Sequence, residues 1–235
     1  MTEGECMKRS AAIFLAGLVG LFVFSPIAYS KDKIKTGVLE KNTFIDSAFG
    51  YSTSVPETWK GRLKNEPSLT RVAIEKSDVQ INPRFSNERS NAGTRPRFLI
   101  LADTLSFSPD QFLDRLFGEA SWKGKGEYLK VLDWRPSDKE IKRSRVSVAG
   151  QPGVQLTLLR NMTEYFSEQK AGPVTGSEFR AEIVTVFRKD NHLFVAVLFS
   201  SEFFLESNFK DTMPAFADWK FLGQNRTDDS TSVRN

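Results

Sequence analysis

Few residues in this chain have the types and spacing that catalysis requires. His192 is the only histidine among 235 residues. It follows a predicted hairpin turn, and no nucleophile-elbow sequence supplies a serine for it. We therefore expect a histidine at the end of a strand and not a Ser-His-Asp site. Carboxylate pairs, Asp46 with Asp211 or Glu178 with Glu182, serve as acid and base only if folding places them in one cleft. The sequence leaves that alternative open.

Metal and nucleotide sites are not indicated. One histidine does not supply an ordinary multi-histidine metal site, and no acidic stretch has the spacing of a calcium loop. Gly124-Lys125-Gly126 resembles the start of a phosphate-binding loop, but position 129 is Leu and no strand leads directly into a helix there. We predict no catalytic residue, no metal and no cofactor.

A basic stretch from Gln80 to Arg97 is the best candidate for a docking surface. It contains one acid, Glu88, and is rich in Asn, Pro, Ser and Gly, which predicts a long loop. Guanidinium groups bind carboxylates and phosphates through paired hydrogen bonds. The candidate partner-binding residues are Arg84, Arg89, Arg95 and Arg97. A solvated insertion is the alternative, and nucleic acid is not expected because Phe85 alone offers a ring for base stacking.

The segment from Trp122 to Arg145 carries four more basic than acidic residues. Trp122, Tyr128 and Trp134 lie among its lysines and either line a second docking surface or pack inside the domain. We favour the second interpretation, because aromatic side chains contribute most when they are buried.

The N-terminal segment indicates export. Lys8 and Arg9 precede an apolar run at 11–24, and Ala28-Tyr29-Ser30 gives a small-x-small pattern. This predicts a signal peptide at 1–30, cleaved near Ser30, although an uncleaved anchor is the alternative. Cys6 is the only cysteine and precedes the apolar run, so we expect no disulfide and no lipid-modified cysteine. The expected location is periplasmic or secreted.

Composition predicts a single folded domain after this signal. The chain has 20 phenylalanines and four tryptophans, enough for an aromatic core. We expect a solvated lead-in at 31–42, one domain at 43–222 with the basic loop at 80–97, and a disordered tail at 223–235. The formal charge of +4 permits weak contact with an anionic membrane surface.

Periodicity gives the elements that must position these residues. Alternating or apolar runs predict strands near 43–46, 50–55, 70–75, 98–105, 154–160, 179–187 and 193–199. Ser108 and Pro109 begin a helix to about 120, and apolar spacing predicts another at 205–216 despite Pro214. Gly150 to Gly153 and Arg188 to Asn191 are expected turns. Trp59 is expected to pack, and Trp219-Lys220-Phe221 to close against the sheet.

These features resemble the PsbP fold family, named for an extrinsic subunit of photosystem II and including exported bacterial proteins. The resemblance rests on the segment from Phe49 to Lys60, on the strands around Gly150 and Gly153, on the three-strand run and on the last helix, and it spans 43–222. It implies an α+β fold with an antiparallel sheet sandwiched by helices on its faces. It also implies accessory binding roles, and no site residue transfers from it.

The sequence therefore favours an exported, non-enzymatic binding protein, an accessory or stabilising factor for an envelope protein complex. One alternative is a photosystem-associated extrinsic subunit, which an organism without photosystem genes would exclude. The other is a hydrolase with dispersed acidic residues. No nucleic-acid partner is expected.

Overall fold

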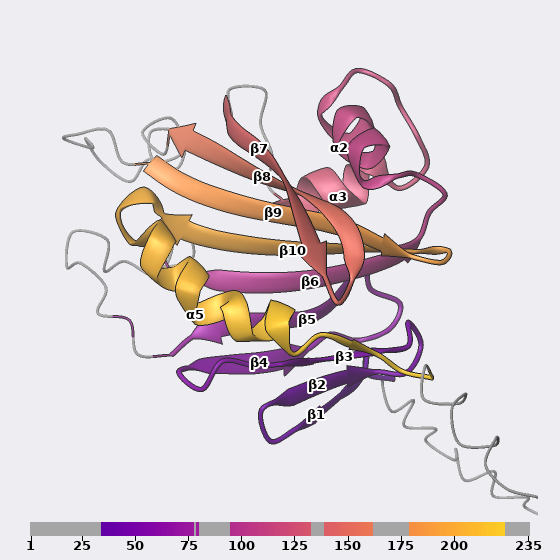
Figure 1. The fold of residues 1–235 in the computed structure, drawn as a ribbon, viewed down its shortest axis with the longest axis vertical. Coiled ribbons are helices and arrows are strands. Elements are labelled where there is room, and N and C mark those ends of the chain that lie inside the picture. The colour runs from indigo at the N-terminus through magenta and orange to yellow at the C-terminus, as the bar shows by residue number, and fades with distance from the viewer. Residues whose placement is uncertain (1–33, 78, 80–94, 133–138, 162–178, 224–235) are drawn as a thin grey trace, which may run out of the picture. The chain divides into compact units, whose positions relative to one another are not determined.

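Two antiparallel sheets carry the fold (Figure 1), in a computed structural model that describes residues 34–77, 79, 95–132, 139–161 and 179–223. The smaller sheet has the strand order β1 (Val38–Glu40), β2 (Thr43–Asp46), β3 (Tyr51–Ser54), β11 (Lys220–Phe221). The larger sheet has the order β4 (Trp59–Leu63), β5 (Thr70–Lys76), β6 (Arg97–Thr104), β10 (His192–Ser201), β9 (Phe179–Lys189), β8 (Gln151–Asn161), β7 (Lys139–Val148).

Helices cover both faces of the larger sheet. Alternate residues of each strand point to opposite faces, which gives the sheet two separate apolar surfaces. On one face lie α2 (Pro109–Phe117) and α3 (Lys125–Leu132). On the other lie α5 (Leu205–Ala217), entered through a short 3₁₀ turn at Glu202–Phe204, and the smaller sheet. The predicted fold class is confirmed, and the second sheet adds a layer that the sequence did not predict.

The predicted meander β8–β9–β10 is present, but the turn that leads into it is displaced. The β7–β8 reversal occupies Ala149 and Gly150, both with positive φ, and β8 already begins at Gln151. Gly153 is therefore a strand residue, where an added Cβ would lie 2.7 Å from the Val186 carbonyl oxygen of β9. This glycine permits close approach of two strands and does not form a turn.

The two clearest helix predictions are confirmed. The Ser108 hydroxyl accepts the Gln111 N–H while the Gln111 side chain accepts the Ser108 N–H, a complete capping box. Helix α2 ends at Phe117, before Gly118, one turn earlier than the apolar spacing predicted. Helix α5 continues past Pro214 to Ala217.

Strands β1 and β4, helix α3 and most of β7 were not predicted. Strand β1 lies within the stretch expected to be a solvated lead-in, β4 follows the proline expected to end its strand, and α3 lies in the basic segment after Trp122. Strands β1 and β4 are short and mostly polar on one side, so their pattern is weak. They are ordered by pairing, β1 with β2 and β4 with β5. No helix among the described residues is long and apolar enough to cross a membrane.

Candidate functional site

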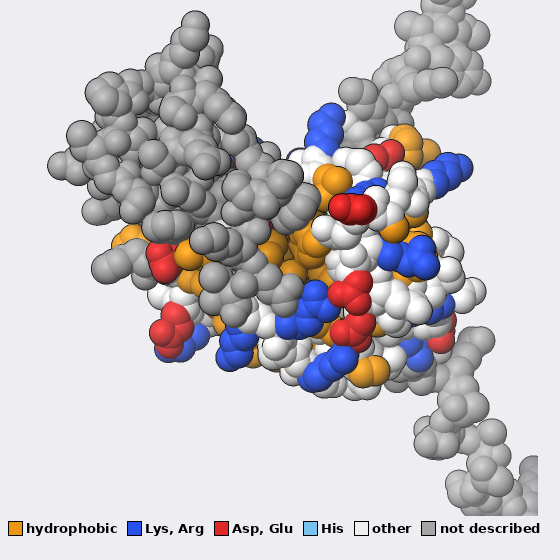
Figure 2. Space-filling view, turned by 90° about the horizontal axis from the view of Figure 1, so that it is seen from above, with side chains coloured by type: hydrophobic (Ala, Val, Ile, Leu, Met, Phe, Trp, Pro, Cys, Tyr) orange, Lys and Arg blue, Asp and Glu red, His pale blue; other side chains and the backbone are white. Residues whose placement is uncertain are grey.

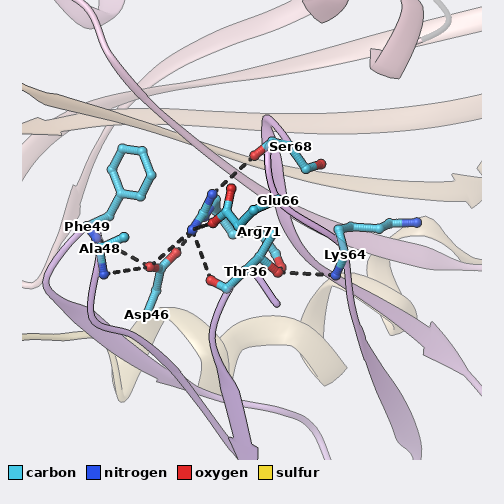
Figure 3. A network of polar contacts seen from close by, with 8 residues as sticks. All are labelled: Thr36, Asp46, Ala48, Phe49, Lys64, Glu66, Ser68 and Arg71. Carbon is cyan, nitrogen blue, oxygen red and sulfur yellow. Dashed lines mark hydrogen bonds and ion pairs between the residues drawn. The ribbon is translucent and has the colours of Figure 1, made fainter. Parts of the chain in front are cut away.

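A buried network of charges joins the two sheets around Arg71 (Figure 3). Asp46 stands at the end of β2 in the smaller sheet, and Arg71 lies in β5 of the larger one. Glu66 comes from the connection between β4 and β5, and Thr36 from the segment that precedes β1. The side chains of Arg71 and Asp46 are 4% and 1% exposed, so this ion pair is almost fully buried.

A β-bulge accounts for the position of Arg71. Thr70 pairs with Leu101 and Val72 pairs with Ile100, so Arg71 is an extra residue in β5 opposite the β6 ladder. A bulge breaks the strict alternation of side chains and turns the extra residue. Plain alternation would put Arg71 on the face of Ala73, which packs with α2 and α3. The bulge instead lets its guanidinium meet Asp46 of the smaller sheet.

The guanidinium of Arg71 is bonded on all sides. Its Nε donates to Asp46 Oδ2 at 2.7 Å, and one terminal nitrogen donates to Glu66 Oε1 at 2.5 Å and to the Thr36 carbonyl at 3.0 Å. The other terminal nitrogen donates to the Ser68 carbonyl at 3.2 Å. The Thr36 hydroxyl donates to the Arg71 carbonyl and accepts the Lys64 N–H. The network therefore fastens four separate chain segments.

Asp46 is fully engaged as an acceptor. Besides the guanidinium, its Oδ1 accepts the N–H groups of Ala48 at 3.1 Å and Phe49 at 3.3 Å. The ring of Phe49 in turn lies under the guanidinium of Arg71, 4.8 Å from its centroid. A general base needs a lone pair that faces a substrate. Those of Asp46 accept from the Arg71 guanidinium and from the N–H groups of Ala48 and Phe49, so this carboxylate holds the two sheets together.

Burial shapes the ionisation of two groups here. Burial opposes the charged form of Arg71, but the hydrogen bonds and charges of Asp46 and Glu66 outweigh it and raise the guanidinium pKa. Burial raises the pKa of Tyr51 well above its ordinary value, and the nearby charge of Asp46 adds to this. Arg71 stays charged and Tyr51 stays neutral at any physiological pH.

The second predicted acid, Asp211, belongs to a different network. Its Oδ2 accepts from Lys76 Nζ at 2.6 Å, and the same ammonium donates to Asn208 Oδ1 at 3.1 Å. Buried Asn208 donates onward to the hydroxyl of Ser200 at 2.8 Å. Asp46 and Asp211 are therefore each neutralised by their own cation. Of the other predicted pair, Glu178 lies outside the described residues and Glu182 is 1% exposed.

His192 is the first residue of β10, as predicted for a strand-end histidine. Its ring meets that of Phe49 edge to face at 5.1 Å, and its Nδ1 lies 3.5 Å from the Thr104 hydroxyl. These neighbours make it a packing residue.

The predicted docking arginines fall partly outside the described residues, which exclude Arg84 and Arg89. Arg95 is half-buried just before β6. Arg97 begins β6, and its guanidinium lies over the ring of Phe199 at 4.8 Å. Arg97 therefore has a packing role, whatever it binds.

The glycine–lysine motif and the aromatic residues after α2 also have structural roles. Lys125 Nζ donates to the carbonyls of Gly118 and Ala120, closing the loop that follows α2. Tyr128 is 1% exposed and donates to Asp103 at 3.3 Å, and the ring of Trp122 packs beside it at 5.5 Å. Trp134 lies outside the described residues.

Sequence analysis missed Arg71 and Glu66, because each is a single charge in a segment with weak pattern. The one local signal is an arginine inside the apolar run Thr70–Ile74, which requires a buried partner. Within the described ranges no group of three or more His, Cys, Asp or Glu side chains is placed to hold a metal ion.

No family model and no curated protein sequence matches the chain. Among solved structures, the chain is similar to cyanobacterial PsbP (CyanoP) of Synechocystis sp. PCC 6803, at 14% identity and a TM-score of 0.45, over 76% of this chain and 91% of that one. It is also similar to LpqN of Mycobacterium tuberculosis, described as involved in cell envelope biogenesis. That match has 11% identity and a TM-score of 0.45, over 81% of this chain and 90% of LpqN. At these values the similarity concerns the fold alone.

Proposed function

We propose that this chain is an exported accessory protein that binds a protein complex of the cell envelope and does not catalyse a reaction. Export rests on the basic, apolar and small-residue pattern of positions 8–30. The observation that carries the binding role is the use of the candidate acids: Asp46 and Asp211 hold separate ion pairs between elements of the fold.

This observation weighs against the hydrolase alternative. An acid–base pair needs two carboxylates that face one substrate, with environments that drive their pKa values apart. Here Asp46 is bonded to Arg71, Ala48 and Phe49, and Asp211 to Lys76. Releasing either carboxylate for catalysis would break a contact that joins two layers of the fold.

The proposed docking residues are the arginines of the basic loop, and the structure sharpens the choice of variant. Arg97 packs on Phe199, so its replacement would disturb the sheet as well as any docking surface. The triple variant R84S/R89S/R95S leaves that contact intact. A matched control, K123S/K130S/K220S, removes the same charge from exposed positions on other elements.

Crosslinking of the native exported protein in intact cells, followed by mass spectrometry, tests the proposal. We expect one reproducible envelope partner that high salt releases, because screening weakens exposed ionic contacts. The arginine variant should lose most of this crosslink and the lysine control should keep it.

Each other outcome contradicts a specific part of the proposal. Equal crosslinking by the arginine variant would remove the basic loop from the docking surface. A photosystem subunit as the partner would favour the extrinsic-subunit alternative. No partner above background would put small-ligand binding or catalysis ahead of the accessory role.

A further inference from the structure

A second basic surface lies on β4, at the edge of the larger sheet, far in sequence from the arginine loop. We call it the β4 surface and define it as Ile34, Lys35, Lys60, Arg62 and Lys64. Residues 60, 62 and 64 are exposed, while the alternate residues Trp59, Gly61 and Leu63 face the interior or are half-buried. Lys60 and Arg62 thus project from alternate positions on one side of β4, and exposed Lys64 follows directly after the strand.

The chain brings Ile34 and Lys35 to the end of this row. The Thr36 N–H donates to the Lys64 carbonyl at 3.1 Å, and the Glu66 N–H donates to the Ile34 carbonyl at 2.8 Å. Lys35 donates to the side chain of Asn65 at 2.9 Å. Ile34 is 74% exposed, the largest exposure among the large apolar side chains that are described.

Little negative charge neutralises the row. Glu75 lies 3.6 Å from Arg62 and is the cross-strand partner of Lys60. Glu66 is directed instead toward Arg71, whereas the ammonium of Lys64 points away from that network (Figure 3). The surface therefore keeps an excess of positive charge.

We propose that the β4 surface rests on an anionic lipid membrane, with the cations near the headgroups and Ile34 inserted among them. The shape of the surface favours a membrane over a single phosphate group. Lys60 and Lys64 are separated by about 13 Å along the strand, so their charges are spread out and do not converge on one point. An exposed apolar side chain beside lysines and arginines is typical of peripheral membrane contact.

The position of the surface in the chain also favours a membrane. Nine residues, 25–33, separate the predicted apolar segment from Ile34, and that length of chain spans at most about 30 Å. While the apolar segment is held in a membrane during export, the β4 surface is within reach of the same membrane. After cleavage, the cations and Ile34 supply a weak, salt-sensitive contact. This inference does not depend on the proposed partner complex.

Flotation of the full chain with lipid vesicles tests the proposal. The vesicles are phosphatidylcholine alone and phosphatidylcholine mixed with phosphatidylglycerol, at low salt and at about 1 M salt, where the Debye length is about 3 Å. We expect binding to the anionic vesicles at low salt only. K60S/R62S/K64S should weaken it by roughly a hundredfold, since each cation near an anionic surface contributes about fivefold.

Matched variants separate the β4 surface from net charge. K123S/K130S/K220S removes the same charge from the segment before α3, from α3 and from β11, and should bind like the parent. I34S should weaken binding without changing its salt dependence. If removing Arg62 from Glu75 unfolds the triple variant, K60S/K64S tests the same row. The proposal would be overturned if K60S/R62S/K64S and K123S/K130S/K220S lost vesicle binding equally. It would also be overturned if binding of the parent did not depend on phosphatidylglycerol or on salt.

Figure 2 shows a different face of the protein, on which lysine, arginine, aspartate and glutamate side chains are interspersed. Elsewhere in the fold Arg143 of β7 pairs with Asp114 of α2 at 2.8 Å, and Arg145 of β7 pairs with Asp110 of α2. Such paired charges attract a membrane weakly. The contrast favours the β4 row as the membrane contact.

Discussion

The indole ring of Trp219 stacks on the phenol ring of Tyr51, with centroids 4.5 Å apart and planes 4° apart. Trp219 directly precedes β11, which pairs with β3 in the smaller sheet. Phe187 and Phe194 of the larger sheet meet the same indole edge to face, at 4.9 and 5.6 Å. One side chain thus links the C-terminal strand to both sheets.

Replacing Trp219 should therefore destabilise the whole fold. We expect Trp219→Ala to lower the free energy of unfolding by about 3–5 kcal/mol, because it leaves a large cavity between packed aromatic rings. Urea denaturation followed by far-UV circular dichroism measures this. Trp219→Phe should cost less, and Leu222→Ala, at a side chain 45% exposed, should change stability by about 0.5 kcal/mol or less. A loss as small for Trp219→Ala would contradict the linking role.

Removing Asp46 should leave the buried guanidinium of Arg71 without its most buried partner. We expect Asp46→Ala to lower the free energy of unfolding by about 3–5 kcal/mol, since Arg71 would lose its most buried partner. Asp211→Ala, whose ion pair is partly exposed, should cost about 1 kcal/mol. Chemical denaturation compares the two.

The same network allows a test by joint replacement. Asp46→Leu combined with Arg71→Met removes both buried charges, so it should be less destabilising than Asp46→Ala alone. If the double variant is less stable than Asp46→Ala, the ion pair itself stabilises the fold, and the cost of Asp46→Ala is not only that of an unpaired buried charge.

Two buried tyrosines should make the protein sensitive to alkali. Burial, with the added charge of Asp46 for one and of Asp103 for the other, raises the pKa of Tyr51 and of Tyr128 above the ordinary value of about 10. The native protein keeps protons that the unfolded chain releases above that pH. Stability should therefore be unaffected below about pH 10 and fall above it by about 1.4 kcal/mol per pH unit for each tyrosine.

Unfolding curves at several alkaline pH values, with phenolate absorbance followed in parallel, measure this slope. Tyr51→Phe and Tyr128→Phe should each reduce the slope, whatever they do to stability at neutral pH. A rise in phenolate absorbance near pH 10, with the fold intact, that Tyr51→Phe or Tyr128→Phe removes would show that the replaced hydroxyl reaches solvent, contrary to its burial.

Loss of the α2 cap should have a modest, local cost. Ser108→Ala removes the acceptor of the Gln111 N–H, and we expect a loss of about 1 kcal/mol. Ser147→Ala, at an exposed position of β7, should change stability by about 0.5 kcal/mol or less and serves as the control. Equal effects in thermal unfolding would mean that the capping box contributes nothing to stability.

The sequence by itself determined the regular part of this protein. Long apolar runs with a clear period predicted β8, β9, β10 and α5, and Ser108 with Pro109 predicted where α2 begins. Local chemistry suffices for the three strands, because each buries wide apolar faces that its pattern shows. Helix α5 forms where its spacing predicted, but its buried residues are Asn208, Thr212 and Ala215, and Met213 of the apolar stripe is 45% exposed. The packing role of Trp59 and the strand-end position of His192 followed from the same local reasoning.

Tertiary structure alone decided the rest. Strands β1 and β4 are ordered by pairing with β2 and β5, and their own sequence patterns are too short to predict them. Asp46 and Arg71 lie 25 residues apart, and only the bulge in β5 and the packing of one sheet on the other bring them together. The β4 row depends equally on a long-range event, because segment 34–36 must pair beside residues 64–66 to place Ile34 next to the lysines. Contacts of this kind arise from register and layer packing, which no local period encodes.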